Sequence, residues 1–529
     1  MPPKFLKWLR VFIAAVVFAA LTAAFVDFRG LVPWQIGHAL AEIQFVPSLV
    51  ALITGASLSL ACIIIAVITL AAGRIYCSAI CPLGIFQDVV IHLTKRPKSR
   101  PAPYTHPHTW LRQTFLWATV AAGVAGFGGF ALSLLDPYSN FGRMASDIFR
   151  PLVTMVNNTI VSSVDKLGWH GLFRVEPHWA SFGALHQPLI LLGLLVVLVV
   201  LGGRLYCNTL CPVGTLLGWL SQRAAFRLQI DQGACRKCAA CLRACKAQCI
   251  DLRAGAIDFS RCVACYNCMD VCDEHGINYR FAWAREKTIP APASQTASDG
   301  VADPQRRAFL SKSILGIAGV TGFSRVLLAA ERSPTGSFET PRNFSPVICP
   351  PGAVSVERFL DRCTACHLCI SECPTGVLQP SFGEYGFIGI MKPRMDYRIA
   401  FCNYDCRHCG EVCPDGAIDL LDLAAKHLVK IGEAQFNRDK CVVVTNGTDC
   451  AACSEHCPTK AVSTIPYGEN LRLPSVNNKL CIGCGACEYA CPVKPDKAIK
   501  VIGLRQHGWA KKNIEPKATL PKSNGDFPF

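Results

Sequence analysis

Charged side chains are scarce in this sequence of 529 residues. Asp, Glu, Lys and Arg together make up 17% of it, whereas 51% is hydrophobic and the mean hydropathy is +0.31. This charge content is too low for an ordinary soluble protein and too high for one that lies wholly inside a membrane. The length predicts about three or four domains.

Acidic residues are the scarcer kind of charge. The sequence has 37 Asp and Glu against 53 Lys and Arg, which gives a formal net charge of +16 and is typical of nucleic-acid-binding proteins. The 31 cysteines favour another interpretation, because they fall in tight runs along a long chain and so indicate metal ligation. Each 4Fe–4S centre with four thiolates carries two negative charges, so six such centres would lower the net charge to about +4. We therefore expect no nucleic acid partner.

Four stretches are long and uncharged enough to cross a bilayer, which takes about 20 apolar residues. Lys and Arg gather before the first stretch, between the second and third, and after the fourth. Both ends of this unit are therefore expected to face the cytoplasm. The predicted spans are Phe5–Val26, Leu49–Ala72, Thr114–Leu135 and Phe182–Gly203.

Composition predicts a multi-domain protein, with a four-span transmembrane α-helical unit and two ferredoxin-like α+β iron–sulfur domains. A segment rich in Pro, Ala and Ser has no periodicity and is interpreted as a disordered linker. The predicted parts are a four-helix membrane domain (1–228), a cytoplasmic two-cluster domain (229–285), the linker (286–304), a signal or fifth anchor (305–330) and a four-cluster domain (331–529).

The two-cluster domain contains two regular C-x2-C-x2-C-x3-C runs. In bacterial ferredoxins such a run gives three thiolates to one 4Fe–4S cluster and the fourth to its neighbour. Zinc is the alternative, but two interlocking runs of four cysteines disfavour it. Crossing the fourth ligands predicts one cluster held by Cys235, Cys238, Cys241 and Cys272, and another held by Cys262, Cys265, Cys268 and Cys245.

The C-terminal domain contains four further runs, each followed by proline, which brings the predicted number of clusters to six. If these runs are similar to those of four-cluster ferredoxin-like subunits, they nest. Cys491 then completes the first cluster and Cys373 the last, while Cys457 and Cys413 complete the middle two. The runs are Cys363, Cys366, Cys369, Cys373; Cys402, Cys406, Cys409, Cys413; Cys441, Cys450, Cys453, Cys457; and Cys481, Cys484, Cys487, Cys491.

A C-x-x-C-H haem-attachment pattern also begins at Cys363. Both of its cysteines are already needed by a complete ferredoxin run, so covalent haem is disfavoured.

A twelve-residue motif occurs twice in the membrane part. Residues 73–84 read GRIYCSAICPLG, and residues 203–214 read GRLYCNTLCPVG. Each copy follows a predicted span at its cytoplasmic end. The C-x3-C-P pairs would hold a seventh cluster, form a dithiol relay or simply pack, and the spacing leaves these three alternatives open. The four thiols concerned belong to Cys77, Cys81, Cys207 and Cys211.

Several single residues lie outside the cysteine runs. Arg74 and Arg204 would either balance thiolate charge or anchor at lipid headgroups. Cys62 lies within a span and is expected to pack as a small hydrophobic residue. For Cys249 and Cys349 the sequence indicates no role.

Residues 1–285, with both C-x3-C-P motifs and the two-cluster segment, resemble the NapH family, the membrane quinol dehydrogenase of periplasmic nitrate reduction. The nitrous-oxide-reductase regulator family and the methylamine-utilisation ferredoxins share these motifs. Residues 305–529 resemble the NapG family, in which a twin-arginine export signal precedes a four-cluster ferredoxin. Arg306 and Arg307 would begin that signal here. The whole chain looks like a fusion of the two subunits.

The candidate signal departs from the usual pattern in two ways. It lies inside the chain, and Leu328 interrupts the small residues before a cut after Ala330. It would then remain as a fifth anchor, and a cytosolic arginine pair before a buried helix is a further alternative.

The resemblance implies a membrane-bound iron–sulfur electron-transfer protein. It would act as a quinol dehydrogenase that passes electrons from the quinol pool to a periplasmic reductase or c-type cytochrome. It would lie in the bacterial inner membrane with its C-terminal domain in the periplasm, delivered by the twin-arginine machinery. The alternatives are an iron–sulfur assembly or maturation factor that reduces a partner metalloprotein, and a ferredoxin-linked membrane oxidoreductase with every cluster on the cytosolic side.

Quinol oxidation needs a proton acceptor near a membrane face. His38 and Glu42 are the candidate quinol residues, with Asp136 and His186 as further candidates on the exported side. No residue is assigned to catalysis on a terminal substrate. The apolar core of a bilayer is about 30 Å thick, too far for a single electron hop between clusters on its two sides. Either the C-x3-C-P centre lies deep in the bilayer, or the two groups of clusters serve separate branches.

Overall fold

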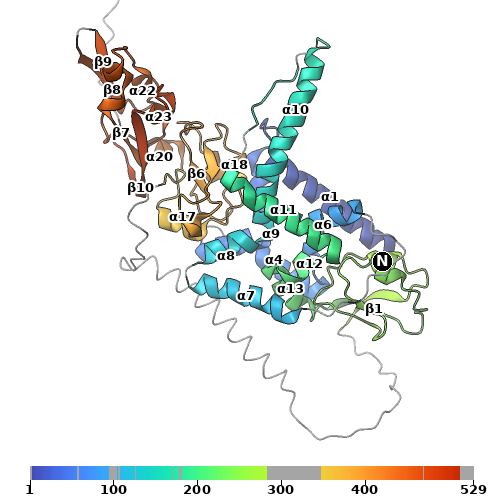
Figure 1. The fold of residues 1–529 in the computed structure, drawn as a ribbon. Coiled ribbons are helices and arrows are strands. Elements are labelled where there is room, and N and C mark those ends of the chain that lie inside the picture. The colour runs from blue at the N-terminus through green and yellow to red at the C-terminus, as the bar shows by residue number, and fades with distance from the viewer. Residues whose placement is uncertain are drawn as a thin grey trace, which may run out of the picture.

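The computed structural model describes residues 3–55, 59–94, 104, 108–125, 127–168, 171–177, 182–282, 347–468 and 470–512. The predicted linker (286–304) and the predicted signal or anchor (305–330) lie outside these residues. Figure 1 shows a helical unit with one ferredoxin-like module at each of two opposite ends. We call residues 226–282 the inner module and residues 347–512 the outer module.

Within the described residues, the helical unit contains fourteen elements, several of them short. They are α1 (Pro3–Val26), α2 (Trp34–Glu42), α3 (Phe45–Thr54), α4 (Ala61–Ala72), α5 (Tyr76–Ala79), α6 (Pro82–Leu93), α7 (Thr109–Val124), α8 (Gly128–Leu135), α9 (Pro137–Met144), the π-helix η1 (Ala145–Phe149), α10 (Arg150–Asp165), α11 (Phe182–Gly202), α12 (Leu205–Thr209) and α13 (Pro212–Ser221).

Two helices of the described chain, α1 and α11, are each long and apolar enough to cross a membrane. Helices α2 and α3 form a third span only if the pair counts as one, because a bend of 83° separates them. Two of the four predicted spans are divided. Helices α3 and α4 share the stretch predicted at 49–72, and α7 and α8 share that predicted at 114–135. Gly55 ends α3 with φ +68°, a left-handed conformation that suits glycine and stops a helix.

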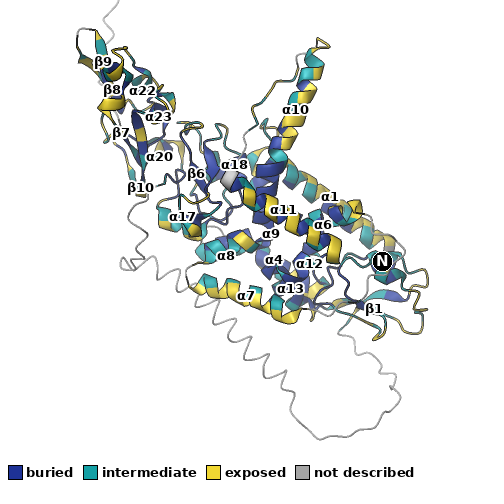
Figure 2. Cartoon of the chain, viewed as in Figure 1, coloured by how far each residue is buried: buried dark blue, intermediate teal, exposed yellow. Residues whose placement is uncertain are grey.

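Large apolar side chains cover the outside of the helical unit. Phe12 on α1 is 68% exposed, and Ile64 on α4 and Val197 on α11 are each 54% exposed. Figure 2 shows α7 and α11 exposed along their outer sides and α9 buried at the centre. Extended apolar surface of this kind marks contact with lipid or with a partner protein.

The inner module is a small ferredoxin-like α+β fold. Its strands pair antiparallel, from Phe226 opposite Phe281 to Ile230 opposite Ile277, and a short second pair lies beside them. A salt bridge of 2.6 Å from Lys7 to Asp270 joins this module to the first turns of α1. The elements are β1 (Phe226–Ile230), α14 (Ala240–Ala244), β2 (Ile250–Asp251), β3 (Ala256–Ile257), α15 (Asn267–Asp270) and β4 (Ile277–Phe281).

The outer module has three antiparallel strand pairs, β5 with β6, β7 with β10 and β8 with β9. Short helices lie between them and carry cysteines. The elements are α17 (Val356–Arg362), α18 (Leu368–Ser371), β5 (Leu378–Pro380), η2 (Phe387–Gly389), β6 (Pro393–Met395), α19 (His408–Glu411), α20 (Leu423–Leu428), β7 (Val429–Phe436), η3 (Arg438–Lys440), α21 (Val442–Thr445), α22 (Ala452–Glu455), β8 (Val462–Tyr467), β9 (Leu471–Val476), α23 (Ala486–Ala490) and β10 (Ile499–Trp509).

Helix α1 links the two modules. Its 24 residues rise about 36 Å at 1.5 Å each, which exceeds the roughly 30 Å of a bilayer core. Lys7 near its start contacts the inner module. Phe25 near its end packs against Gly142, which itself lies against the carbonyl oxygen of Cys366 in the outer module. The two modules therefore occupy opposite ends of a helix that is long enough to span a membrane.

Candidate iron–sulfur centres

Cysteine thiols dominate every candidate site, and all 31 cysteines are free. Among the described residues, no group of three or more His, Cys, Asp or Glu side chains is close enough to hold a single metal ion. The ligands of a cubane cluster bind four separate iron atoms and therefore stand farther apart than those of one ion. The thiols fall into groups whose members lie within electrostatic range of one another.

The regular cysteine runs share one backbone device. In each, the residues just before and just after the second cysteine have positive φ, as Lys237 and Ala239 do around Cys238. The same pair recurs as Ala365 and His367, and as two glycines in the last run. Alternating backbone of this kind turns successive N–H groups toward one point and favours a bound anion. The loops are therefore built to surround a negatively charged group.

The inner module brings together the two thiol sets that the crossed ligand pattern predicts. The Cys241 thiol lies in range of those of Cys235, Cys238 and Cys272. The second set is Cys245, Cys262, Cys265 and Cys268, which line one cavity together with Cys249.

Cys249 has a place in this second set that the sequence did not indicate. Its sulfur lies 3.6 Å from the Cys245 sulfur, and the hydrogen bond between them lowers the pKa of Cys245 to about 6. A thiol donor beside a cluster ligand withdraws charge from that ligand and so adjusts the potential of the centre.

The outer module groups its thiols by neighbouring runs. The first three thiols of the first run lie in electrostatic range of the Cys413 thiol. The first three thiols of the second run lie in electrostatic range of the Cys373 thiol. The first three cysteines of the third run line a cavity together with Cys491. The first three thiols of the fourth run lie in electrostatic range of the Cys457 thiol. The nested order expected by analogy is therefore wrong.

The strand pairs explain why neighbours exchange ligands. Strand β5 follows the first run and pairs with β6, which precedes the second. Strand β7 precedes the third run and pairs with β10, which follows the fourth. The β5–β6 ladder therefore lies between the two runs of one two-cluster unit, and the β7–β10 ladder joins the two ends of the other. Sequence spacing alone does not determine which strands pair, because the pairing depends on side-chain burial across the sheet.

The four thiol groups of the outer module lie in an order that differs from the sequence. The Cys369 thiol is in range of that of Cys409, which places the first and second centres together. The Cys402 N–H donates to the Cys484 carbonyl at 2.9 Å, and Cys487 lies in range of Cys453. Outward from the helical unit, the thiol group of the first run is followed by those of the second, the fourth and then the third run. Figure 1 shows α18 near the helices, α23 farther out and α22 beyond it.

Burial makes these thiols poor acids while they are free. It raises the pKa of Cys363 to about 11, and of Cys413, Cys453 and Cys484 to about 12. Iron binds thiolates, so ligation at neutral pH must release protons and must overcome this burial. The donor set fits iron–sulfur clusters, in which the bound iron supplies the positive charge that the buried thiolates need.

The repeated C-x3-C-P motifs meet at the centre of the helical unit. The thiols of all four cysteines lie within electrostatic range of one another, and none of the four residues is more than 4% exposed. Pro82 and Pro212 begin α6 and α13 directly after each pair, where the missing N–H costs nothing. We call Cys77, Cys81, Cys207 and Cys211 the tetrathiol site.

The motif arginines cross between the two copies. Arg204 donates from Nη1 to the Cys77 carbonyl at 2.7 Å, and Arg74 donates from Nη2 to the Cys207 carbonyl at 3.3 Å. Both side chains are fully buried, so anchoring at headgroups is wrong. Arg74 Nη2 also lies 3.7 Å from the Cys77 sulfur, and Gln87 donates to the Cys207 sulfur at 3.1 Å. Cationic and amide donors aimed at the sulfurs stabilise a negatively charged centre.

The last glycine of each motif is required by close packing. A Cβ atom at Gly84 would lie 2.2 Å from the Cys77 carbonyl oxygen, and one at Gly214 would lie 2.2 Å from that of Cys207. Each glycine lets α6 or α13 approach the preceding cysteine loop.

The inner module closes one side of the tetrathiol site. Arg74 donates from Nη1 to the Ser260 carbonyl at 3.0 Å, two residues before Cys262. The Arg204 N–H donates to the carbonyl of Lys246, the residue after Cys245. The second thiol set of this module is therefore the neighbour of the tetrathiol site.

Asp88 joins the two motif copies and the inner module through ion pairs that the sequence did not indicate. Its carboxylate lies 2.8 Å from Arg204 and 3.0 Å from Lys246, and it also pairs with Arg10. The second motif copy has Gly218 at the corresponding position, against the Ser260 carbonyl. A lone acid within the apolar helix α6 was the available signal.

The residues proposed for quinol have ordinary surroundings. His38 and Glu42 pair on α2 with 3.5 Å between Nε2 and Oε1. Asp136 caps α9 by accepting from the N–H groups of Tyr138 and Ser139.

His186 lies on α11. Cys62 is buried on α4, and Cys349 lies 3.2 Å from the Tyr385 hydroxyl.

Comparison with known proteins supports iron–sulfur binding at several of these places. One family profile, described as a 4Fe-4S binding domain, matches residues 53–101 and 187–230, which contain the two C-x3-C-P motifs. Another of the same description matches residues 356–379 and 474–495, which contain the first and last runs of the outer module. No solved structure matches the chain.

Curated relatives are ferredoxin-type proteins. The methylamine utilization ferredoxin-type protein MauM of Paracoccus denitrificans (strain Pd 1222) is 30% identical over 215 residues, 39% of this chain and 87% of that protein. NapF of Escherichia coli (strain K12) is 28% identical over 152 residues, 29% of this chain and 84% of NapF. NapG of the same strain is 30% identical over 165 residues, 29% of this chain and 70% of NapG.

Proposed function

Because the chain belongs to the family of ferredoxin-type iron–sulfur electron-transfer proteins that includes MauM, we propose that it is a membrane-bound quinol dehydrogenase. It takes electrons from the quinol pool and passes them to a periplasmic reductase or c-type cytochrome. Its clusters supply one-electron acceptance and donation. The protein positions their thiolates, excludes water and adjusts each potential through hydrogen bonds and charge.

The observation that carries this proposal is a continuous row of thiol sites through the helical unit. Arg74 joins the Ser260 carbonyl of the inner module to the Cys77 sulfur. On the other side, Asn140 of α9 donates to the Tyr206 hydroxyl at 3.0 Å, next to Cys207. The tetrathiol site therefore has the inner module against one side and α9 against the other.

Helix α9 is the layer between the tetrathiol site and the first centre of the outer module. Asn140 and Gly142 are two positions apart, so they point to nearly opposite sides of the helix. Asn140 faces Tyr206, and Gly142 faces the Cys366 carbonyl. The separation is then about one helix width, ~10 Å, in place of a ~30 Å bilayer core. This supports a tetrathiol centre that lies deep in the membrane and joins the two groups of clusters.

We assign the tetrathiol site to a seventh 4Fe–4S cluster. The convergence of all four thiols, the crossed arginines and the match of a 4Fe-4S binding-domain family to both motif copies support this assignment. A dithiol relay needs only two close thiols, and mere packing needs no buried cation directed at sulfur.

We further propose that the membrane is the bacterial inner membrane and that the outer module lies in the periplasm. Its place at the far end of α1 from the inner module supports opposite sides. Basic loops at the inner end support a cytoplasmic location for the inner module. Arg306 and Arg307 would then direct export, and the third centre of the outer module, the most distant from the helices, would face the acceptor.

Reduction by quinol tests the function directly. The purified full chain is mixed with menadiol, and reduced clusters are counted by EPR against a dithionite-reduced sample. We expect menadiol to reduce clusters of both modules. Clusters that dithionite reduces and menadiol leaves oxidised would contradict the quinol dehydrogenase and favour a maturation factor, which need not turn over with quinol.

Cutting the row of centres tests its continuity. The double variant Cys77→Ser/Cys207→Ser retains all six ferredoxin runs. We expect menadiol to reduce clusters on one side of the cut at the wild-type rate and those on the other side far more slowly. Equal rates of cluster reduction on both sides would show that electrons do not pass through the tetrathiol site.

Topology is tested separately with a C-terminal tag and added protease in intact spheroplasts. Cleavage is expected, and replacement of Arg306 and Arg307 by lysine should abolish it. A tag that stays protected would favour the ferredoxin-linked oxidoreductase with all clusters in the cytosol.

A further inference from the structure

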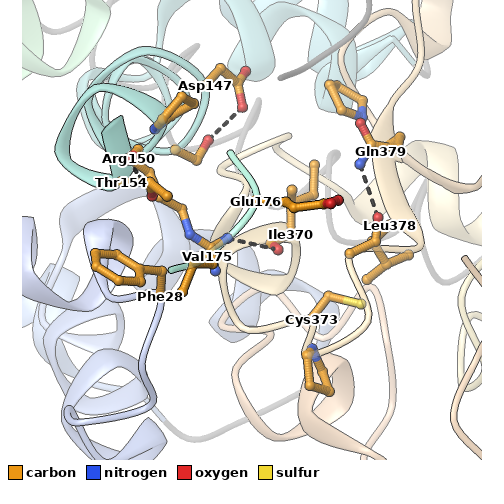
Figure 3. A pocket seen from close by; sticks show the side chains of 15 residues that line it. Phe28, Asp147, Arg150, Thr154, Val175, Glu176, Ile370, Cys373, Leu378 and Gln379 are labelled. Carbon is orange, nitrogen blue, oxygen red and sulfur yellow. Dashed lines mark hydrogen bonds between the residues drawn. The ribbon is translucent and has the colours of Figure 1, made fainter. Parts of the chain in front are cut away.

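We propose that the cavity between the helical unit and the outer module binds the ring of a hydroquinone. This inference rests on the proposed quinol dehydrogenase function and assigns its substrate site. Figure 3 shows the cavity from close by. Its volume is about 110 Å³, and part of it is open to solvent. Its lining includes Phe28, Asp147, Arg150, Glu176, Ile370 and Cys373.

Asp147 supplies a buried acceptor in the wall of the cavity. The residue is 4% exposed, and its Oδ1 accepts from the Ser146 hydroxyl at 2.7 Å. Nδ1 of His367 lies 3.1 Å from Oδ1 and 3.0 Å from Oδ2. A carboxylate oxygen can accept more than one hydrogen bond, so Oδ2 can also accept one from a ring hydroxyl in the cavity.

The local backbone explains how Asp147 comes to face the cavity. Residues 145–149 form the π-helix η1 between α9 and α10. A π-turn inserts an extra residue and shifts the following side chains around the helix, and such turns are frequent at functional sites. His367 is held from its other side, with Nε2 2.7 Å from the Met391 carbonyl.

Arg150 supplies a hydrogen-bond donor to the cavity. Its guanidinium crosses the cavity toward the Ile370 carbonyl, with 3.5 Å between Nη1 and that oxygen (Figure 3). This contact is long and weak, so the guanidinium can donate to a ligand oxygen instead. Phe28 and Ile370 offer apolar surface for the ring between these polar groups. Acceptor, donor and apolar walls together match a hydroquinone or its quinone product.

The cavity wall also carries cluster ligands. Cys373 lines the cavity and completes the second centre of the outer module, while Ile370 follows Cys369 of the first. A hydroquinone becomes a quinone by losing two protons and two electrons. The electrons would leave singly toward the oxidised 4Fe–4S centres held by Cys369 and Cys373. One proton would go to Asp147, and the other would reach solvent through Glu176 at the exposed rim.

An apolar row leads from the cavity along α10. Leu152, Val156 and Ile160 repeat every four residues and are 47%, 59% and 48% exposed. They begin beside Arg150 and follow a helix that projects away from the other helices in Figure 1. A lipid-soluble quinol could approach along this row. His38 and Glu42 are not among the residues that line the cavity.

Binding of a quinol-site inhibitor tests the site without requiring turnover. The probe is 2-heptyl-4-hydroxyquinoline N-oxide, and its fluorescence quenching is titrated on the full chain with verified iron content. Thr154 lines the cavity, is 3% exposed and bonds its hydroxyl only to the Arg150 carbonyl. Thr154→Trp should fill the cavity and weaken binding at least tenfold. Thr159→Trp is the matched control, since Thr159 makes the same bond to Met155 but is exposed.

Two further variants complete the test. Asp147→Asn should weaken binding at least tenfold, and Glu42→Gln should leave it within twofold of wild type. Unchanged binding in Thr154→Trp would overturn the site, as would weakened binding in Glu42→Gln alone.

Menadiol reduction separates this inference from the proposed function. In the variant cut at Cys77 and Cys207, the outer module should be the side that menadiol reduces at the wild-type rate. Fast reduction of the inner module alone would move the entry point away from this cavity and leave the quinol dehydrogenase intact. Failure of menadiol to reduce any wild-type cluster would remove both.

Discussion

The tetrathiol site can be tested by adding one methyl group next to it. In Gly84→Ala the new Cβ would lie 2.2 Å from the Cys77 carbonyl oxygen, where ordinary contacts are 3.4 Å or more. The loop that carries Cys77 must therefore move by about 1 Å, at a cost of about 1–3 kcal/mol for overpacking. Metal ligands tolerate displacements of only about 0.2–0.5 Å. We expect Cys77 to leave its ligand position while the six ferredoxin runs stay intact.

Iron analysis measures this loss. Seven cubane clusters give about 28 iron atoms per chain, and loss of the tetrathiol cluster leaves about 24. Gly214→Ala should produce the same loss, because its Cβ would meet the Cys207 carbonyl oxygen at the same 2.2 Å. Gly193→Ala is the control, since a Cβ there has no atom within 4 Å.

Three results would refute this reasoning. Wild-type protein with about 24 iron atoms would exclude a seventh cluster. Equal iron in Gly84→Ala and Gly193→Ala would show that the close approach to Cys77 is unimportant. Loss of all iron in Gly84→Ala would indicate general misfolding in place of a local displacement.

Three more outcomes follow from the outer module and from Asp88. The double variant Cys491→Ser/Cys441→Ser should lose no more iron than either single variant, because both residues belong to one centre, whereas additive losses would restore the nested order. Asp88→Asn should cost about 3–5 kcal/mol by leaving buried cations without their carboxylate, seen as a lower thermal denaturation temperature. Asp496→Asn, an exposed control, should leave that temperature unchanged, and equal effects would contradict the role of Asp88. Burial lowers the pKa of His507 to about 4, below its unfolded value of 6.5. The unfolded state therefore takes up the proton first as the pH falls, and the folded state loses stability between pH 6.5 and about pH 4. Between pH 7 and pH 5 the free energy of unfolding should fall by about 2 kcal/mol less in His507→Gln than in wild type, as measured by denaturant titrations. An unchanged pH dependence would show that His507 stays accessible to water.

The sequence predicted most of the thiol chemistry because ligand spacing is local. A C-x2-C-x2-C run determines its own loop, so the two sets of the inner module could be grouped by crossing Cys245 with Cys272. Helices α6 and α13 begin at Pro82 and Pro212, directly after the C-x3-C pairs, which is likewise a local feature. Each regular run covers only eleven residues, and the crossing of Cys245 with Cys272 follows from the ferredoxin pattern.

Features that depend on distant contacts were not predicted. Which run exchanges its last cysteine with which depends on the pairing of β7 with β10, across more than sixty residues of chain. The crossed arginines depend on the two motif copies facing each other, and the sequence had left Arg74 with two alternatives. The division of two predicted spans was also missed, because an uncharged stretch indicates burial or lipid contact and does not indicate where a helix turns.

Asp147 shows why the cavity could not be found from sequence. It belongs to a polar segment after a predicted span, and nothing near it in the sequence indicates a neighbour in the outer module. Its partner His367 lies 220 positions away. Their meeting depends on the docking of the outer module against η1 and α10.

The exchange of ligands between neighbouring runs has a consequence for biosynthesis. All eight ligands of the first two outer centres lie between Cys363 and Cys413, and all eight of the other two lie between Cys441 and Cys491. The ribosome therefore delivers a complete set for one cubane pair before it makes the first thiol of the next. Under a nested order no cubane in this module could close until Cys453 had emerged. The observed order lets cluster insertion follow translation in two separate stages, and it confines the damage from a late truncation to the distal pair.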